Sequence, residues 1–278
     1  MIELSAGLPP ATLDAIAGLE RRVVAADGGR LKLEWEALRG RGGQRAEDVL
    51  WWEGDRLLGF LGVYSHSAPT LELTGMVDPA ARRRGIGTAL LDAGLQLCAR
   101  REHSAVQLVV PRSSAGGRVL AQRRGGKLEG SEHALRLPGE PVEVPADPRV
   151  TIRAAVPADQ QAVREVSLRA FGWAPAATAA FDPHTLVVER DGALIGTIRL
   201  IPEPGGAGIY GFAIDPEYQG RGIGRDVLHR VCRTAATPVH LEVATGNDRA
   251  LHLYTSLGFE LVTTEDYYGL PGRLPMSS

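Results

Sequence analysis

Residues 209–224 read Ile-Tyr-Gly-Phe-Ala-Ile-Asp-Pro-Glu-Tyr-Gln-Gly-Arg-Gly-Ile-Gly, and a helical pattern follows them. Residues 71–87 have the same order, Leu-Glu-Leu-Thr-Gly-Met-Val-Asp-Pro-Ala-Ala-Arg-Arg-Arg-Gly-Ile-Gly, again before a helical pattern. The glycines Gly85 and Gly222 are 137 residues apart, close to half of the 278-residue chain. That offset is too long for a solenoid period and indicates a duplicated domain.

Two hairpins fall at matching positions in the halves. The turn at 53–55 separates the apolar runs 49–52 and 57–63, and Asp191-Gly192 separates 186–188 from 193–196. Each half is predicted to run strand, one or two helices, three strands, glycine-rich turn, helix, strand, helix and closing strands. This order predicts an α/β fold in which each half is a mixed, mostly antiparallel sheet flanked by helices.

A proline-rich stretch separates the two copies. It runs from Leu137 to Pro148 and contains Pro138, Pro141 and Pro145. We interpret it as a stiff, extended connector. The predicted domains are therefore 1–147 and 148–278, as expected for 278 residues at roughly 150 residues per domain.

Composition excludes several classes of protein. Hydrophobic residues make up 44% and charged residues 23%, as in globular proteins, and a net charge of −2 gives no general attraction to nucleic acid or anionic lipid. No run approaches the ~18 apolar residues of a membrane helix, and no signal peptide opens the chain, so we expect a cytoplasmic protein without a membrane partner. Two cysteines, Cys98 and Cys232, are too few for a disulfide framework or a Cys-rich metal site; we expect packed thiols and no metal.

The glycine-rich turns have the pattern of an anion site. A strand, a turn with Gly220, Gly222 and Gly224, and then a helix direct backbone N–H groups into one concavity at the positive end of the helix. Glycine permits unusual backbone angles and removes the Cβ that would hold a phosphate away. The Walker A and Rossmann loops are excluded, because neither Gly-Lys-Ser/Thr nor the third Rossmann glycine is present. By itself such a turn also suits a purely structural role.

Arg82-x-x-Gly85-x-Gly87 and Gln219-x-x-Gly222-x-Gly224, each after a strand and Asp-Pro, resemble the cofactor motif of the GNAT superfamily of acetyltransferases. The resemblance implies that the turns hold the pyrophosphate of acetyl-CoA. In the second half it implies cofactor contacts at Phe212, Ala213, Ile214, Gln219, Gly220, Arg221, Gly222, Ile223, Gly224 and Arg225, with the amides of the first three holding the thioester carbonyl and pantetheine where the strands splay. In the first half the matching positions are Met76, Val77, Arg82, Arg83, Arg84, Gly85, Ile86, Gly87 and Thr88.

Residues 241–259 read Leu-Glu-Val-Ala-Thr-Gly-Asn-Asp-Arg-Ala-Leu-His-Leu-Tyr-Thr-Ser-Leu-Gly-Phe. Strand alternation puts His240 and Glu242 on one side, Asn247 or Asp248 caps a helix over about 250–257, and Gly258 suits its C′ position. The segment resembles the last catalytic motif of GNAT enzymes, most closely the bacterial acetyltransferases of ribosomal-protein N-termini. The resemblance implies that Tyr254 is the general acid for the CoA thiolate, that Glu242 is the base, directly or through water, and that Asn247 caps the helix, contacts the cofactor, or both.

Elementary chemistry favours these residue types. An attacking amine must be neutral, whereas an α-amino group with a pKa near 8 is only about a tenth neutral at pH 7, so a carboxylate that removes its proton helps. A phenol with a reference pKa of ~10 stays protonated and can donate to the departing thiolate. A tyrosine on an apolar helix stripe also suits the core, and a strand glutamate also suits the solvent face.

The first copy lacks both proton-transfer groups. Aligning residues 108–114 with 241–247 puts Val109 at the position of Glu242 and Ser114 at that of Asn247, and Ala121 then replaces Tyr254. Our hypothesis is that the first half binds CoA weakly, or only supports the second half, and does no chemistry.

The tandem arrangement also resembles mycothiol synthase, which acetylates the cysteinyl amine of a glycosidic thiol precursor. The base expected in that family is a glutamate on the strand before the phosphate turn, and Gly208 stands at the corresponding position here.

The sequence therefore predicts an acetyl-CoA-dependent N-acetyltransferase that transfers directly to a primary amine of a small molecule or peptide, with mycothiol synthase as one alternative. A non-catalytic acyl-CoA sensor is an alternative of another class, and a scaffold for a protein partner is a third; the oligomeric state stays open. Family geometry suggests acceptor contacts at Phe171, Trp173, Tyr210 and Tyr267, for which core or surface roles are equally open.

Overall fold

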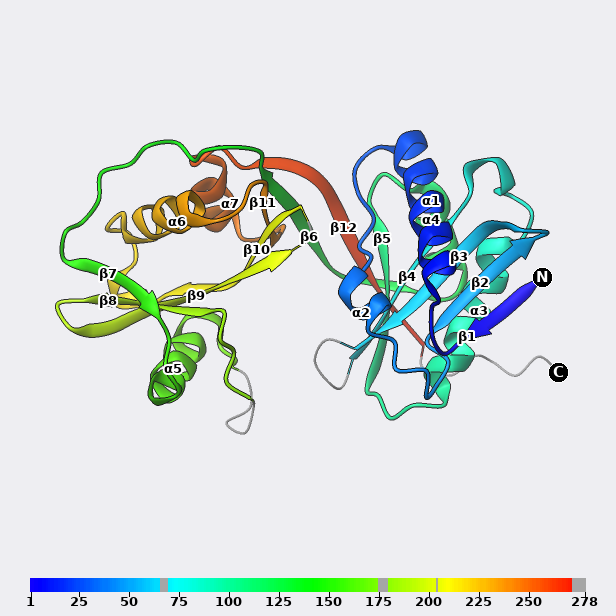
Figure 1. Cartoon of the computed structure of the whole chain (residues 1–278), viewed down its shortest axis with the longest axis horizontal. Helices are drawn as coiled ribbons and strands as arrows, with labels where there is room; N and C mark the ends of the chain where they lie inside the picture. The colour runs from blue at the N-terminus through cyan, green and yellow to red at the C-terminus, as the bar shows by residue number, and fades with distance from the viewer. Residues whose placement is uncertain (66–69, 175–179, 204, 272–278) are drawn as a thin grey trace. The chain divides into compact units, whose positions relative to one another are not determined.

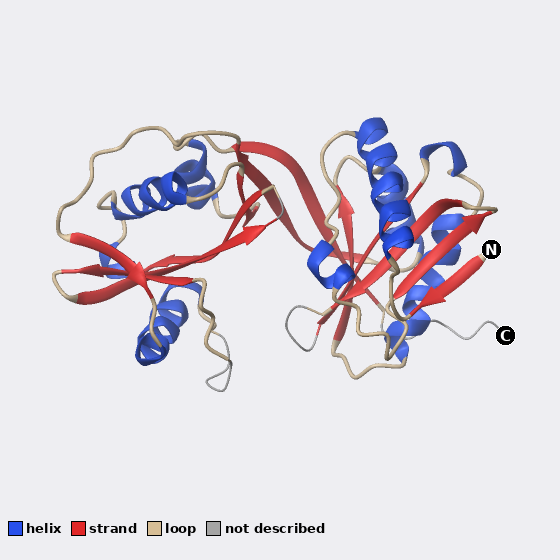
Figure 2. Ribbon diagram, viewed as in Figure 1, coloured by secondary structure: helices blue, strands red, loops and turns tan. Residues whose placement is uncertain are grey.

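A computed structural model of the chain describes residues 1–65, 70–174, 180–203 and 205–271 (Figure 1). The chain forms two compact units. The first unit is Met1–Glu132 together with Thr263–Ser278, and the second unit is His133–Val262. Each unit combines a mixed sheet with helices, which confirms the predicted α/β class (Figure 2).

The sheet of the first unit has the strand order β1-β2-β3-β4-β5-β12. The β4–β5 pair is parallel, and the β1–β2, β2–β3, β3–β4 and β5–β12 pairs are antiparallel. Helix α1 packs on one face through Ile16 and Leu19, and α3 packs through Leu90 and Leu91 into a second apolar cluster. The elements are β1 (Ile2–Ser5), α1 (Pro10–Asp27), α2 (Trp35–Arg39), β2 (Asp48–Glu53), β3 (Arg56–Tyr64), β4 (Thr70–Val77), α3 (Ile86–Ala99), β5 (Ala105–Pro111), α4 (Ala115–Arg123), the start of β6 (Lys127–Leu137) and the end of β12 (Glu260–Leu270).

The sheet of the second unit has the order β6-β11-β10-β9-β8-β7, with β10 and β11 parallel. Its core lies between the sheet and helices α6 and α7, where Val227 and Leu228 meet Leu241 and Val243. Helix α5 packs on β9 and β10 from the other side (Figure 2). The elements are β7 (Val150–Ala154), α5 (Gln160–Phe171), β8 (Thr185–Arg190), β9 (Ala193–Glu203), β10 (Gly206–Ile214), α6 (Ile223–Thr234), β11 (Val239–Ala244) and α7 (Asp248–Thr255), with the end of β6 and the start of β12.

Both predicted hairpins are confirmed, because β2 pairs with β3 and β8 with β9 in antiparallel register. Of the predicted connector Leu137–Pro148, Leu137 ends β6, and residues 138–148 contain no helix or strand. The repeat is visible in detail as well. Asp78 and Asp215 each cap the short 3-10 turn that follows β4 or β10. Asp78 pairs with Arg22 of α1, and Asp215 pairs with Arg169 of α5.

The closing strands β6 and β12 do not each stay in the unit formed by their own sequence copy. The end of β12 pairs with β5, so Tyr268 and Leu270 belong to the core of the first unit. The end of β6 neighbours β11, and Leu135 and Leu137 belong to the core of the second unit. The compact units thus differ from the segments 1–147 and 148–278, and the boundary of the duplicated segments stays a prediction.

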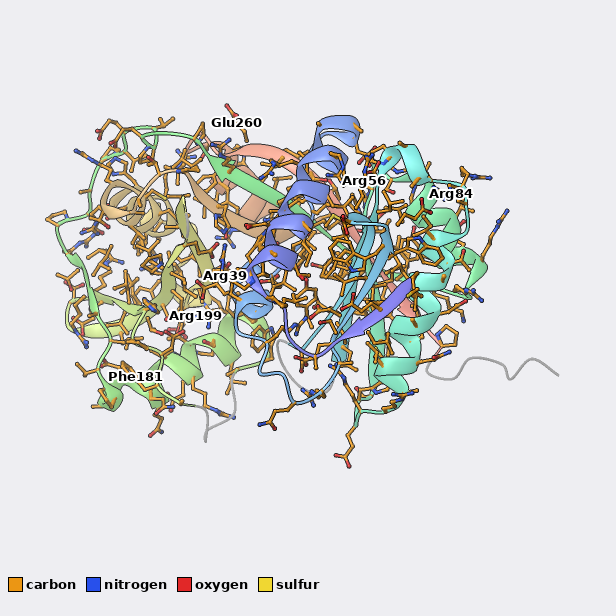
Figure 3. The ribbon with its side chains drawn as sticks, turned by 45° about the vertical axis from the view of Figure 1, so that its right-hand side comes forward. Arg39, Arg56, Arg84, Phe181, Arg199 and Glu260 are labelled. Carbon is orange, nitrogen blue, oxygen red and sulfur yellow. The ribbon has the colours of Figure 1, made fainter. Side chains whose placement is uncertain are left out.

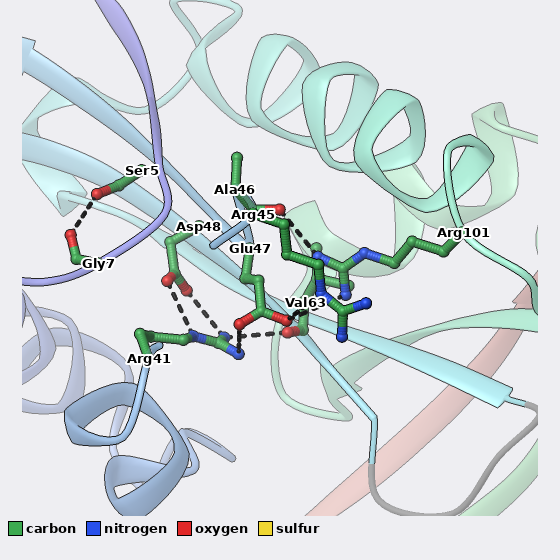
Figure 4. A network of polar contacts seen from close by, with 9 residues as sticks. All are labelled: Ser5, Gly7, Arg41, Arg45, Ala46, Glu47, Asp48, Val63 and Arg101. Atoms are coloured by element: carbon green, nitrogen blue, oxygen red, sulfur yellow. Dashed lines mark hydrogen bonds and ion pairs between the residues drawn. The ribbon is translucent and has the colours of Figure 1, made fainter. Parts of the chain in front are cut away.

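A polar network anchors one edge of the first unit (Figure 4). Arg41 donates two hydrogen bonds of 3.0 Å to the fully buried Asp48 and a third, also 3.0 Å, to the carbonyl of Val63. Burial raises the pKa of Asp48 to about 6, although the guanidinium of Arg41 acts in the opposite direction. The network fixes the segment before β2 against β3.

The two cysteines are packed thiols, as predicted. Cys98 and Cys232 are each 1% exposed, and burial raises their pKa values to about 11 and about 12. No helix in the described part of the chain is long and apolar enough to cross a bilayer.

Candidate active site

The turn after β10 forms the predicted cradle. Gly220 and Gly222 have φ values of +78° and +80°, in the left-handed region that glycine occupies without a Cβ penalty. Gly222 is the N-cap of α6. Within the described ranges, the backbone N–H groups of residues 221–224 donate to no protein acceptor. Open N–H groups at a helix N-terminus are an anion site.

A cavity of about 310 Å³ opens at this helix end. Arg221 and Arg225 line it, and within the described residues neither pairs with a carboxylate. The carboxylate of Asp226, which also lines the cavity, pairs instead with Arg230, with a nitrogen–oxygen distance of 2.8 Å. Unneutralised arginines beside open N–H groups suit a diphosphate. The full lining is Val144, Pro145, Asp147, Arg221, Gly222, Ile223, Arg225 and Asp226.

Part of this wall comes from the proline-rich connector. Val144, Pro145 and Asp147 contribute to the cavity, and the amide of Asp147 donates to the carboxylate of Asp226. Sequence reasoning missed these residues, because they carry no motif and were interpreted only as a spacer.

The turn after β4 has the same backbone conformation as the turn after β10, but two of its arginines are paired with carboxylates. Arg83 and Gly85 have φ values of +63° and +80°, matching Gly220 and Gly222. Here Arg82 donates to both carboxylate oxygens of Asp27, at 2.8 and 2.6 Å, and Arg84 pairs with Glu53. The first cradle therefore has two of its arginines already neutralised by the protein.

A gap between β10 and β11 leads away from the second cradle. The strands pair only at Ala207–Val239 and Gly208–His240, although β10 continues to Ile214. The register of β10 against β9 shifts between residues 210 and 213, where Gly211 has a φ of +57°. The strands thus splay as the expected contacts at 212–214 require, and the contacts themselves stay predictions.

Helix α7 places the proposed acid. Of the two predicted caps, Asn247 takes the role, accepting from the N–H of Ala250 at 3.1 Å. The helix runs from Asp248 to Thr255 instead of 250–257, and Gly258 follows with a φ of +97°. Tyr254 is 8% exposed within the apolar core, and burial raises the pKa of its phenol to about 12.

The alternation of β11 is confirmed. Leu241 and Val243 are buried in the core that also contains Tyr254, whereas Glu242 is partly exposed on the opposite face. The two proposed proton-transfer groups therefore lie on opposite faces of β11.

The four predicted acceptor residues divide between the units. Phe171 and Trp173 are 41% and 63% exposed, and their rings stack with centroids 5.9 Å apart. Tyr210 lies on β10 beneath the guanidinium of Arg199, 5.8 Å from its ring centre. Tyr267 belongs to the first unit.

Within the first unit, the hydroxyl of Tyr267 donates a hydrogen bond of 2.5 Å to Glu132 and accepts one of 2.6 Å from Lys32. The roles of all four residues as acceptor contacts stay predictions.

Sequence reasoning also missed a cluster of Glu203, Tyr210 and His240. The hydroxyl of Tyr210 donates to Oε1 of Glu203 at 2.7 Å, and Nε2 of His240 lies 3.0 Å from Oε2. The three residues come from β9, β10 and β11, so only the strand register brings them together.

The matching positions of the first copy fit the alignment. Ser114 caps α4 by accepting from the N–H of Gly117 at 3.2 Å, as Asn247 caps α7. Val109 and Ala121, at the positions of Glu242 and Tyr254, are 3% and 0% exposed. Apolar packing replaces both groups.

Each unit thus has a pair of parallel strands that part beside a glycine-rich turn at a helix N-terminus. The sequence model of the acetyltransferase (GNAT) family matches residues 21–125 and 154–259, and the chain belongs to this family. The protein is an acetyl-CoA-dependent N-acetyltransferase.

Several curated relatives are mycothiol acetyltransferases. That of Mycobacteroides abscessus is 30% identical over 84% of this chain and 88% of its own length. That of Kytococcus sedentarius is 33% identical over 95% and 96%.

Solved structures share the fold across the whole chain. A GCN5-related N-acetyltransferase from Sphaerobacter thermophilus has a TM-score of 0.78 at 23% identity, covering 100% of this chain and 98% of that one. A tandem GNAT protein from the clavulanic acid biosynthesis pathway has a TM-score of 0.71 at 16% identity, covering 99% and 100%.

Proposed function

We propose that the second unit binds acetyl-CoA and transfers the acetyl group directly to a primary amine of a small molecule or peptide. The observation that supports this most is the contrast between the cradles. Arg221 and Arg225 face a cavity without a carboxylate partner among the described residues, whereas Arg82 and Arg84 of the first cradle are paired with Asp27 and Glu53.

The residues present fit the cofactor. The open N–H groups of residues 221–224 and the two arginines would hold the diphosphate, and the gap beyond Gly208 and His240 would take the pantetheine. When bound, acetyl-CoA supplies an acetyl group activated as a thioester.

Two side chains of the protein then transfer the protons. Glu242 accepts a proton from the acceptor nitrogen, directly or through water. Tyr254 donates its proton to the departing thiolate. Because burial raises the pKa of Tyr254 to about 12, the phenol remains protonated throughout the neutral range and is available as an acid.

The first unit does no chemistry in this account. Val109 and Ala121 are buried apolar residues at the positions of the proposed base and acid, so this unit binds CoA weakly or only supports the second unit.

A second candidate acceptor is a mycothiol-type amine. The names of the relatives, at 30–34% identity, favour it. A third reading, an acyl-CoA sensor without turnover, differs from both because it would not require Glu242 or Tyr254.

The test is CoA release with a panel of primary amines, a cysteinyl amide and a short peptide with a free N-terminus among them. We expect Tyr254→Phe and Glu242→Gln each to lower kcat by about 100-fold, a typical contribution of a general acid or base, with acetyl-CoA binding retained. Tyr64→Phe, which removes a buried phenol hydroxyl of the first unit, is the matched control. Equal rates in all variants would remove the assigned roles. Tight acetyl-CoA binding without turnover of any amine would favour the sensor.

A further inference from the structure

The closed end of the gap between β10 and β11 holds a carboxylate that no motif indicates. The pair Gly208–His240 is the last at which the strands are bonded, and we call this point the vertex. Glu203 ends β9, the other neighbour of β10. Because Gly208 lies opposite Ile201 and Tyr210 opposite Arg199, the alternation of β9 puts Glu203 on the same face as these residues.

The missing side chain of Gly208 makes room for Glu203. A Cβ on Gly208 would lie 2.5 Å from Oε1 of Glu203 and 2.5 Å from the ring of Tyr210. The carboxylate therefore occupies the space above the vertex that a side chain at position 208 would otherwise fill.

Both oxygens of this carboxylate are held. Oε1 accepts from the hydroxyl of Tyr210 at 2.7 Å, and Oε2 lies 3.0 Å from Nε2 of His240. The side chains of Glu203 and His240 are 26% and 28% exposed. The carboxylate is thus fixed in position yet open to an incoming molecule.

The vertex lies at the far end of the path from the cradle. The cradle follows Ile214, and six residues back along β10, at ~3.3 Å each, place Gly208 about 20 Å away. A thioester chain held at the cradle and running back along the gap would direct its acyl end toward the vertex. An amine that attacks from the side opposite the thiol then arrives beside Glu203.

We propose that Glu203 is the residue that takes the proton of the incoming ammonium, with Tyr210 and His240 as positioning residues. This inference rests on the proposed function. The ammonium gives one proton to the carboxylate of Glu203, and the neutral nitrogen attacks the thioester carbon. The C–N bond forms and the C–S bond breaks. As it becomes an amide, the nitrogen loses a second proton, which Glu242 accepts directly or through water. The thiolate gains one proton from Tyr254, so one proton in total is released to water.

The surroundings suit a protonated amine. Glu242 lies two residues beyond His240 on the same face of β11 and adds a second carboxylate to this face. Arg199, labelled in Figure 3, lies on the same face of β9 four residues before Glu203, and a nitrogen of its guanidinium lies 3.3 Å from a carboxylate oxygen of Asp182. Tyr210 on β10 and His240 on β11 contact the carboxylate of Glu203 directly.

The test compares kcat/KM across pH for the wild type and Glu203→Gln, using the best acceptor of the amine panel. Glu260→Gln is the matched control, because Glu260 is an exposed carboxylate of the same unit that points away from the sheet (Figure 3). We expect Glu203→Gln to lose about 100-fold at pH 7. The loss should shrink by up to about tenfold per pH unit as pH rises toward the pKa of the amine, because the solvent then supplies the neutral nucleophile.

Two further variants separate chemistry from folding. Tyr210→Phe and His240→Gln keep the carboxylate but remove one support each, so we expect smaller losses of the same pH-dependent form. Calorimetric binding of acetyl-CoA should stay unchanged in all variants. A loss in Glu203→Gln that is the same at every pH, or no larger than in Glu260→Gln, would overturn the inference and leave the proposed function standing. A wild type that binds acetyl-CoA yet turns over no amine would overturn both.

Discussion

At the scale of single residues, burial decides what each ionisable group can do. Tyr254 packs among apolar side chains, and the same burial that makes it a core residue raises the pKa of its phenol to about 12. The core and chemical interpretations of this tyrosine are therefore compatible. Burial also raises the pKa of Asp48, to about 6. That value lies below neutral pH, so this fully buried carboxyl group is charged at pH 7, whereas the Tyr254 phenol is neutral.

The Arg41–Asp48 pair gives a prediction with a definite pH dependence. Arg41→Met leaves a buried carboxylate without its guanidinium, which we expect to lower the free energy of unfolding at pH 7 by about 3–5 kcal/mol. The folded-state pKa of Asp48, about 6 with Arg41 present, lies above its ordinary value of 3.8, so the folded state binds the extra proton. Stability from this group is therefore present at low pH and lost as pH rises through the folded pKa.

The measurement is urea unfolding of the wild type and Arg41→Met at pH 7 and pH 5. The difference between the two proteins should be smaller at pH 5, where the orphaned carboxylate is protonated. Arg45→Met is the control, because the side chain of Arg45 is 64% exposed. A difference that grows at pH 5, or that does not exceed the control, would contradict this account of the network.

At the scale of elements, the closing strands β6 and β12 determine what can fold alone. A fragment of residues 1–147 lacks Tyr268 and Leu270 from its core, and a fragment of residues 148–278 lacks Leu135 and Leu137. Each fragment also exposes an unpaired strand edge, β5 or β11.

We therefore expect both fragments, expressed separately, to be poorly folded or aggregated, and to recover structure when mixed or co-expressed. Circular dichroism and amide-proton dispersion in NMR spectra would measure this. Two well-dispersed, cooperatively unfolding fragments would show that each sequence copy closes its own sheet.

The sequence predicted the individual turns, helices and strands better than it predicted which strands pair with one another. Glycine at 220 and 222, the Asp-Pro before the turn and the Asn247 cap are local signals, because each depends on the backbone angles or hydrogen bonds of its neighbours. Which sheet a closing strand joins depends on long-range pairing, and the apolar alternation of β6 and β12 is the same for either sheet. The Glu203 cluster was missed for a related reason, since strand register alone assembles it.

At the scale of the whole molecule, the two copies contain cradles that share a backbone conformation and differ in the pairing of their arginines. The first neutralises Arg82 and Arg84 internally, and the second leaves Arg221 and Arg225 facing a cavity. In the first copy, apolar residues also stand at the positions of the proposed acid and base. The division of labour that we propose follows from these substitutions, while the fold is retained in both units.

The most direct test of this account is a crystal structure of the protein with CoA bound. The account predicts the diphosphate on the N–H groups of residues 221–224 and the sulfur in the gap between β10 and β11, within hydrogen-bonding distance of the Tyr254 hydroxyl. Density for CoA at the first cradle alone, or a sulfur placed outside that gap, would contradict it.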